Sequence, residues 1–225
     1  MFAASSLSRE SIAMFYEPAK RNHGLPHSPL KAIVAPRPIG WISSLTPDGV
    51  ANLAPYSFFN LICEVPPLVM FCSLGAKDSL ANIAATGEFV CNLVTLDLID
   101  AVNLTSTPAP RDVSEFDVAG LARAPSTLVK PPRVAASPCA LECVYVETFR
   151  PRAKDGTQTN AHMVIGEVVG VHINDAAIID GRVDIAAVKA LARCGYLDYA
   201  PVDRLIERER PPGGGMDMKA RTPAA

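Results

Sequence analysis

Two glycines, Gly166 and Gly170, interrupt a long apolar strand predicted over residues 160–173, and they constrain the fold more than any other feature of the chain. They lie four residues apart, so both fall on one face of the strand. Glycine inside a strand marks a bulge, a barrel bend or a close approach of another backbone. Such sharp curvature favours a closed barrel over a flat sheet.

The other apolar runs also predict strands separated by turn residues. They form two hairpins and two separate strands, at residues 39–45 with 50–54, 140–149 with 160–173, 68–74 and 88–94. The first hairpin turns at Thr46-Pro47-Asp48-Gly49, where proline presets φ and glycine accepts a positive φ. We expect the strand 68–74 to be buried on both faces, because it is apolar throughout. The fold is therefore expected to be mainly β.

Predicted helices are few and short. Residues 79–86 carry apolar side chains at helical spacing and stop at Gly87, a residue typical of helix C-termini. The pattern recurs more weakly over 96–103. A further helix is predicted over 184–193, with Asp184 as its cap.

One domain is predicted over residues 31–210, between an N-terminal extension over 1–30 and a disordered tail over 211–225. Inside the domain, the segment 107–138 contains six prolines and little periodicity. We expect this segment to cross the surface in an ordered way, because it carries four apolar side chains to bury, namely Phe116, Leu121, Leu128 and Val134.

Composition argues against several kinds of partner. The 21 basic and 23 acidic residues give a net charge of −2 and are scattered along the chain, so neither nucleic acid nor a membrane is expected. No apolar run approaches the roughly 18 residues of a membrane-spanning helix, and residues 1–10 lack a signal-peptide pattern. The six cysteines and four histidines show no metal-site spacing. We therefore expect a reduced, cytoplasmic protein without a metal.

The stretch Ser73–Asn82 offers a place for a phosphate. A strand ends at Ser73, Gly75 gives the turn, and a helix begins near Ser79, where free N–H groups and the positive end of the helix dipole attract anions. Lys77 adds a charge just before that helix. The alternative is an ordinary capped helix with a solvated lysine, and the spacing alone favours it.

The stretch Asn52–Asn60 could meet the polar edge of a flat heterocycle. Pro55 lacks a backbone donor and so does not belong inside a central strand, and a break in the ladder there would free backbone N–H groups. The alternative is a core segment in which Phe58 and Phe59 are packed.

Four single residues are weaker candidates. Arg37 lies between two prolines, which suits the presentation of a charge, and Trp41 could flank a ring system; a surface arginine and a core tryptophan remain open as alternatives. His162 and Arg193 stand alone, and such residues are more often structural. Because the chain has no dinucleotide-binding glycine motif and no hydrolase motif, redox chemistry would belong to a bound cofactor.

In their order and spacing, these segments resemble the flavin-reductase-like family of FMN-binding split barrels, from about Ala35 to Pro211. The segments that carry the resemblance are APRPIGWISS at 35–44, NLAPYSFFN at 52–60, KDSLANI at 77–83, TGEFVCNL at 86–93, EF at 115–116, AGL at 119–121, HMVIGEVVGVHI at 162–173 and ARCGYLDY at 192–199.

The resemblance implies a six-stranded split barrel that works as a homodimer, with FMN at or near the dimer interface. The stretch matching 52–58 would lie along the isoalloxazine and ribityl chain, and the turn matching 73–79 would hold the phosphate. On this basis the cofactor-binding residues are Arg37, Trp41, Asn52, Ala54, Pro55, Tyr56, Ser57, Phe58, Ser73, Lys77, Asp78, Ser79, Asn82 and Arg193.

Reductases of this family pass a hydride from NADH or NADPH to flavin N5 and often supply reduced flavin to a partner oxygenase. Several carry Gly-Asp-His near the nicotinamide; here Asn160-Ala161-His162 keeps the histidine as the catalytic-site candidate and lacks the aspartate. Cys194-Gly195 stands where many members of the family have a pair of glycines.

Two other functions stay open. One is an FMN-binding electron carrier without NAD(P)H activity. The other is a pyridoxamine-phosphate-oxidase-like enzyme, which needs a basic pocket for a second phosphate, and the sequence shows no clear arginine cluster for one.

Overall fold

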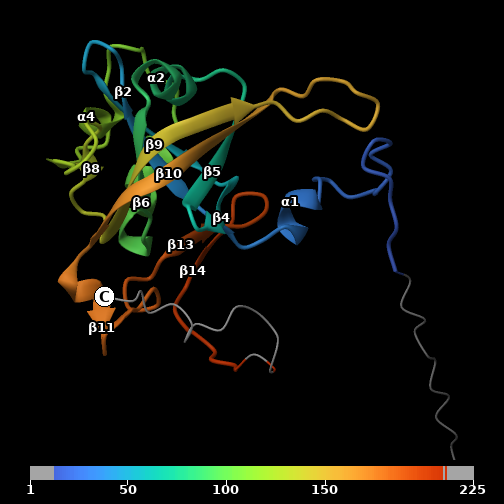
Figure 1. Ribbon diagram of the computed structural model, residues 1–225. Helices are drawn as coiled ribbons and strands as arrows, with labels where there is room; N and C mark the ends of the chain where they lie inside the picture. The colour runs from blue at the N-terminus through green and yellow to red at the C-terminus, as the bar shows by residue number, and fades with distance from the viewer. Residues whose placement is uncertain (1–12, 210, 212–225) are drawn as a thin grey trace, which may run out of the picture.

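A seven-stranded antiparallel sheet curls around the centre of the computed structural model, which describes residues 13–209 and residue 211 (Figure 1). Its strand order is β3-β2-β6-β9-β10-β5-β4. The strands are β2 (Gly40–Leu45), β3 (Ala51–Tyr56), β4 (Phe59–Glu64), β5 (Pro67–Leu74), β6 (Glu88–Leu93), β9 (Cys139–Phe149) and β10 (Ala161–Ile173). The two predicted hairpins and the two separate strands are all present.

The two edges of this sheet are consecutive in the chain. β3 pairs with β2 at one edge and β4 pairs with β5 at the other, and only Ser57 and Phe58 separate them. The chain therefore leads from one edge of the sheet to the other, which curls the sheet into a split barrel. Counted as one bent strand, β3 and β4 complete the six strands that the family resemblance implied.

The predicted bend at the glycines is confirmed. The register between β9 and β10 shifts between Ile165 and Gly166, and again between Val168 and Gly170. A Cβ atom on Gly166 would lie 2.3 Å from the ring of Phe89, so glycine is needed for that ring to pack against the strand. The bulges and the close packing bend the longest strand of the sheet.

The expectation that strand 68–74 is buried on both faces is wrong for one face. Along β5, Val69, Phe71 and Ser73 are buried, whereas the alternating positions are half-buried or exposed. A barrel strand has one face inside and one outside, and the described chain covers only the inner face fully.

The first two predicted helices are confirmed. α2 (Asp78–Thr86) ends at Gly87, whose φ of +76° is the left-handed conformation of a helix C-terminus. The second, over 96–103, consists of a 3₁₀ turn, η1 (Leu96–Leu98), that leads into α3 (Ile99–Leu104).

The helix predicted over 184–193 is wrong. The Asp184 carboxylate does accept hydrogen bonds from the N–H groups of Ala186 and Ala187, as a cap would, but the chain only turns. Lys189 has a positive φ of 49°, which ends any helical path. The chain then forms β13 (Leu191–Arg193), because strand pairing outweighs the weak helical pattern.

β13 belongs to a small second sheet beside the barrel. It pairs with β1 (Arg37–Pro38) on one side and with β14 (Tyr199–Pro201) on the other. The remaining short elements are α1 (Leu30–Ile33), α4 (Glu115–Val118), β7 (Arg123–Ala124), β8 (Arg133–Val134), η2 (Asp175–Ala177), β11 (Ile178–Ile179) and β12 (Arg182–Val183).

The segment 107–138 is ordered and crosses the surface, as predicted. Phe116 and Val134 anchor it in the core, but Leu128 is 62% exposed, so its predicted burial is wrong. A carboxylate does the anchoring there instead: buried Glu142 accepts hydrogen bonds from the N–H groups of residues 127, 128 and 129 at 2.6–3.0 Å.

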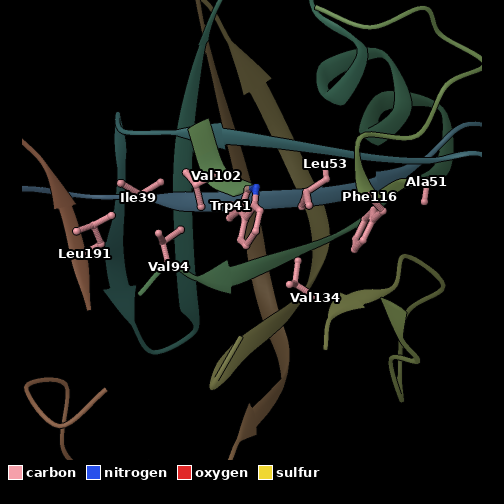
Figure 2. Close-up of a cluster of buried hydrophobic side chains, with 9 residues drawn as sticks. All are labelled: Ile39, Trp41, Ala51, Leu53, Val94, Val102, Phe116, Val134 and Leu191. Atoms are coloured by element: carbon pink, nitrogen blue, oxygen red, sulfur yellow. The ribbon is translucent and has the colours of Figure 1, made fainter. Parts of the chain in front are cut away.

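One core cluster fills the space between β2, β3 and the helices, and Trp41 is at its centre (Figure 2). A second cluster, around Phe71 and Phe89, fills the barrel.

No helix in the described part of the chain is long and apolar enough to cross a membrane. Apart from residue 211, the predicted tail lies outside the described residues, as do residues 1–12 of the predicted extension.

Candidate functional site

A cavity of about 550 Å³ opens between the start of α2, the strand β3 and the loop that follows β13. The residues that line it come from five parts of the chain: Lys31, Arg37, Asn52, Ala54, Pro55, Tyr56, Ser57, Phe58, Cys72, Leu74, Ala76, Lys77, Asp78, Ser79, Thr105, Ser106, Thr107, Pro108, Ala109, Glu115, Arg193, Cys194 and Tyr196. The two stretches predicted to hold a cofactor therefore share one cavity.

A buried polar network forms the end of the cavity nearest α2, which we call the α2 end. The Ser79 hydroxyl donates to Asn52 Oδ1 at 2.8 Å, and Asn52 Nδ2 donates to Glu115 Oε2 at 2.9 Å. The same carboxylate oxygen accepts the N–H of Leu53 at 2.9 Å. Because all these groups are buried, the network fixes β3, α2 and α4 against one another.

An uncommitted positive charge stands beside this network. Lys77 occupies the N-cap position of α2, is exposed, and lines the cavity. Within the described chain, no hydrogen bond or ion pair engages its ammonium group. The hydroxyl-bearing residues 105–107 line the same cavity. Helix N–H groups, an ammonium and hydroxyls together suit an anion such as a phosphate.

The cavity also contains a buried hydroxyl group without a partner. Tyr56 packs its ring against Phe71, with 4.6 Å between the ring centroids, and its hydroxyl has no hydrogen bond among the described residues. Burial raises the pKa of Tyr56 above its ordinary value; the hydroxyls of Ser79 and Ser73 lie near enough to lower it in part, but not in hydrogen-bonding geometry with the phenol. The phenol therefore stays protonated and offers a donor that the folded chain does not use.

Pro55 lies within β3, which continues to Tyr56, so the predicted break in the ladder is wrong. The proline is tolerated because β3 is an edge strand of the sheet: its outer side needs no backbone donor there. The outer edge of β3 lines the cavity from Ala54 to Tyr56.

At the other end of the cavity Arg37 is buried and lines the cavity, so the surface arginine considered as an alternative is wrong. Its guanidinium donates to the carbonyls of Lys31 (2.7 Å) and Val34 through Nη1, and to the carbonyl of Cys194 (2.7 Å) through Nη2. Its Nε has no partner among the described residues. The centroid of the Phe58 ring lies 5.9 Å from the guanidinium carbon.

Arg193 lies on β13 and not at a helix end as the sequence suggested. Its guanidinium donates to the carbonyls of Asp198 (2.8 Å) and Tyr196 (2.7 Å) and lies 4.5 Å from the centroid of the Tyr199 ring. Together with Lys31 and Arg37 it forms what we call the basic end of the cavity.

Most of the predicted cofactor residues line this cavity, and three do not. Those that do are Arg37, Asn52, Ala54, Pro55, Tyr56, Ser57, Phe58, Lys77, Asp78, Ser79 and Arg193. Trp41 is fully buried in the core, where its Nε1 donates to Thr105 Oγ1 at 2.9 Å (Figure 2). Ser73 and Asn82 are buried beneath the site, donating to Gly75 O and Ser44 Oγ. The side chains of these three residues support the site and do not face it.

His162, the catalytic-site candidate, also lies outside the cavity lining. It is half-buried on β10, paired with Ser73 across the ladder to β5. Sequence reasoning in turn missed Lys31, Thr107 and Glu115. Glu115 was within a quoted segment, but nothing local showed that its carboxylate would reach β3, and Lys31 gave no signal at all.

Comparison with known proteins identifies the family. The model of the flavin reductase like domain matches residues 34–183. An uncharacterized protein of Halalkalibacterium halodurans is 35% identical over 184 residues, which cover 79% of this chain and 87% of that protein.

Two solved structures are also similar. Nitrilotriacetate monooxygenase component B from Bacillus cereus has a TM-score of 0.78 and 26% identity, covering 87% of this chain and 98% of its own. The 2-nitrobenzoate 2-nitroreductase of Pseudomonas fluorescens has a TM-score of 0.71 and 30% identity, covering 81% and 88%. The chain therefore belongs to the flavin reductase like domain family, and its function is flavin-related oxidation and reduction.

Proposed function

We propose that this protein binds FMN in the cavity and is an NADH- or NADPH-dependent flavin reductase that passes a hydride to flavin N5. The observation that carries the proposal is the cavity itself, which has an anion-binding end at Lys77 and an edge strand along its length. Two of its lining residues, Tyr56 and Arg37, have buried donors with no partner among the described residues, as expected where a ligand completes the hydrogen bonding.

The lining residues divide into two roles. Lys77, the start of α2 and Thr107 would hold the phosphate of FMN, and residues 54–58 would lie along its ring and ribityl chain. FMN, when bound, supplies the two-electron chemistry that no side chain of this site provides. The chain contributes position and exclusion of water, since this reaction needs no side chain as an acid or base. For His162 we propose a place near the nicotinamide.

Absorption spectroscopy tests the cofactor. We expect a yellow protein, or one that takes up added FMN; a colourless protein that binds none would overturn the proposal.

Replacing Lys77 and Ser79 together with alanine should weaken FMN binding by about tenfold or more, because a charge-assisted contact and a network hydroxyl are lost. Unchanged affinity in that double variant would refute the placement of the phosphate.

Anaerobic mixing with NADH or NADPH tests the reductase activity. Rapid loss of the flavin's visible absorption supports hydride transfer. Stable absorption would instead favour the second function, an FMN-binding electron carrier that receives electrons from another protein. The similarity to a monooxygenase component supports a partner oxygenase as the recipient of the reduced flavin.

We also propose that the protein is a homodimer. Large apolar side chains are exposed along β9 and β10, among them Val144 (41%), Val146 (49%), Phe149 (42%) and Val171 (59%). Exposed apolar surface on a sheet is typical of an interface. Sedimentation of the protein should give twice the chain mass, and Val146→Glu should shift the measured mass toward that of the monomer.

We propose the cytoplasm as the location of the protein. The six cysteines are all unpaired, which supports a reducing compartment.

A further inference from the structure

The two polar ends of the cavity lie too far apart for one phosphate to reach both. β3 runs from Asn52, which is bonded to Ser79 at the α2 end, to Tyr56, whose partner across the ladder is Gly40, three residues after Arg37. These four steps of extended strand span about 13 Å. In Figure 1, α2 lies at the top of the barrel, whereas α1, β13 and β14 lie toward the bottom. A ligand whose phosphate sits at Lys77 leaves the basic end without an anion.

The charges around the cavity are unevenly distributed. Its two lining carboxylates, Asp78 and Glu115, both belong to the α2 end and are already engaged: Asp78 pairs with Arg111 at 3.1 Å, and Glu115 holds the polar network. Among the residues that the structure describes, three cations and no carboxylate line the basic end. Its arginines contact neutral carbonyls, so their charges are solvated but not balanced.

The basic end is also rigidly built. Arg37 is only 8% exposed, and a buried charge without a counter-ion is unfavourable unless an anion arrives. Arg193 is held by two carbonyls and an aromatic ring. Two residues after Arg193, Gly195 packs so closely on α1 that a Cβ atom would lie 2.6 Å from Ala32 Cα. The loop after β13 and the helix that carries Lys31 are thus fixed together.

We propose that the basic end is a second anion subsite, which binds a phosphate or carboxylate of the second substrate while the FMN phosphate occupies the α2 end. The proposal rests on the proposed function, because it assigns the two ends to two different ligands. A nicotinamide dinucleotide would bring its pyrophosphate, and an aromatic acid would bring a carboxylate; both present the same anionic oxygens to Lys31, Arg37 and Arg193.

A binding experiment tests the subsite without turnover. Pyrophosphate and benzoate are titrated by calorimetry into the FMN-loaded protein, its Lys31→Glu variant and a control, Lys130→Glu. Lys31 is exposed and its side chain makes no hydrogen bond or ion pair within the described chain, so the variant should fold. Lys130 is also exposed but does not line the cavity. We expect Lys31→Glu to weaken at least one anion about tenfold and Lys130→Glu to leave both within twofold.

Kinetics then identify the source of the anion. For the wild type and for Lys31→Glu, the KM for NADH or NADPH is divided by the KM for N-benzyl-1,4-dihydronicotinamide, a hydride donor without phosphate. If this ratio is about tenfold higher in Lys31→Glu than in the wild type, the anion belongs to the dinucleotide. If the ratio is unchanged and benzoate binding is weakened, the anion is the carboxylate of another substrate. If Lys31→Glu leaves the affinities for pyrophosphate and benzoate both unchanged, the proposal is overturned. It is also overturned if Lys31→Glu weakens FMN binding as much as it weakens anion binding, because Lys31 would then belong to the flavin site.

The two proposals can fail separately. If the wild-type protein takes up no FMN, the proposed function fails, and the same titrations on the protein as purified still test the basic end. Lys31-dependent binding of pyrophosphate or benzoate then supports an anion subsite, and its absence overturns one.

Discussion

The two ends of the cavity are built in opposite ways. The α2 end is made largely by a strand, a turn and a helix that follow one another between Ser73 and Asn82, with Asn52 and Glu115 bonded to them through side chains. The basic end is assembled from residues about 160 positions apart, joined by the pairing of β1 with β13 and by the bond from Arg37 to the carbonyl of Cys194. The first depends on local turn chemistry and the second on tertiary pairing.

This difference predicts that each end can be damaged alone. The largest effect should come from Glu115→Ala, which leaves the buried Asn52 amide and the Leu53 N–H without an acceptor. We expect a loss of about 3 kcal/mol in the free energy of unfolding and about 100-fold weaker FMN binding. Urea denaturation and FMN titration measure the two effects.

Glu142→Ala is the matched control for this variant. Glu142 is likewise buried and accepts backbone N–H bonds, but it holds residues 127–129 outside the cavity. It should lose similar stability while the folded protein keeps its FMN affinity. An equal loss of FMN affinity in both variants would mean that the α2 end is no separate unit.

Acid should weaken the fold through Glu142. Burial opposes ionisation of this carboxyl, but the hydrogen bonds from His172 and the N–H groups of residues 127–129 outweigh it and lower its pKa to about 2. Because the folded pKa lies below the ordinary 4.5, the stabilisation is complete above about pH 5 and is lost as the pH falls toward 2.

Between pH 6 and pH 3 this amounts to about 2 kcal/mol in the free energy of unfolding. Urea denaturation at both pH values measures it. Glu142→Gln should be less stable at pH 6 and should lose about 2 kcal/mol less than the wild type on acidification. The same pH dependence in the variant would assign the acid sensitivity to other carboxylates.

At the basic end we expect a smaller effect, from Gly195→Ala. The new methyl group would meet the backbone of Ala32, so the loop after β13 and α1 must separate, at a cost of about 1 to 2 kcal/mol. The KM for NADH or NADPH should rise several-fold while FMN affinity stays within twofold. Weakened FMN binding would instead show that the two ends are coupled through β3.

What the sequence could predict follows the same division. The turn at Gly75 and the helix that stops at Gly87 are local, and both were predicted with their boundaries nearly correct. The barrel bend was predictable because Gly166 and Gly170 mark it directly. The helix expected over 184–193 was wrong, because Leu191–Arg193 pairs with a strand from the start of the domain.

The site residues show the same limit. Trp41 was left open between core and cavity, since a lone tryptophan has no pattern that tells the two apart; its bond to Thr105 joins residues 64 positions apart. Local patterns could not predict the basic end, because its cations are scattered through the chain and meet only when β1 pairs with β13. The family resemblance named Arg37 and Arg193, but neither the resemblance nor a local pattern pointed to Lys31. Local chemistry predicted one end of the cavity, and long-range pairing determines the other.

The smallest expected effect is that of Arg111→Ala. Arg111 bridges Asp78 and Asn82 of α2, with bonds of 3.1 Å to each, but its side chain is 52% exposed. Exposed ion pairs contribute about 0.5 kcal/mol, and screening by salt reduces even that. FMN dissociation, followed by stopped-flow fluorescence, should therefore accelerate no more than about threefold, and the difference should vanish in high salt. A much faster dissociation that persists in salt would mean that residues 105–111 act as a strap over the phosphate, and the α2 end would then depend on a surface contact as much as on its buried network.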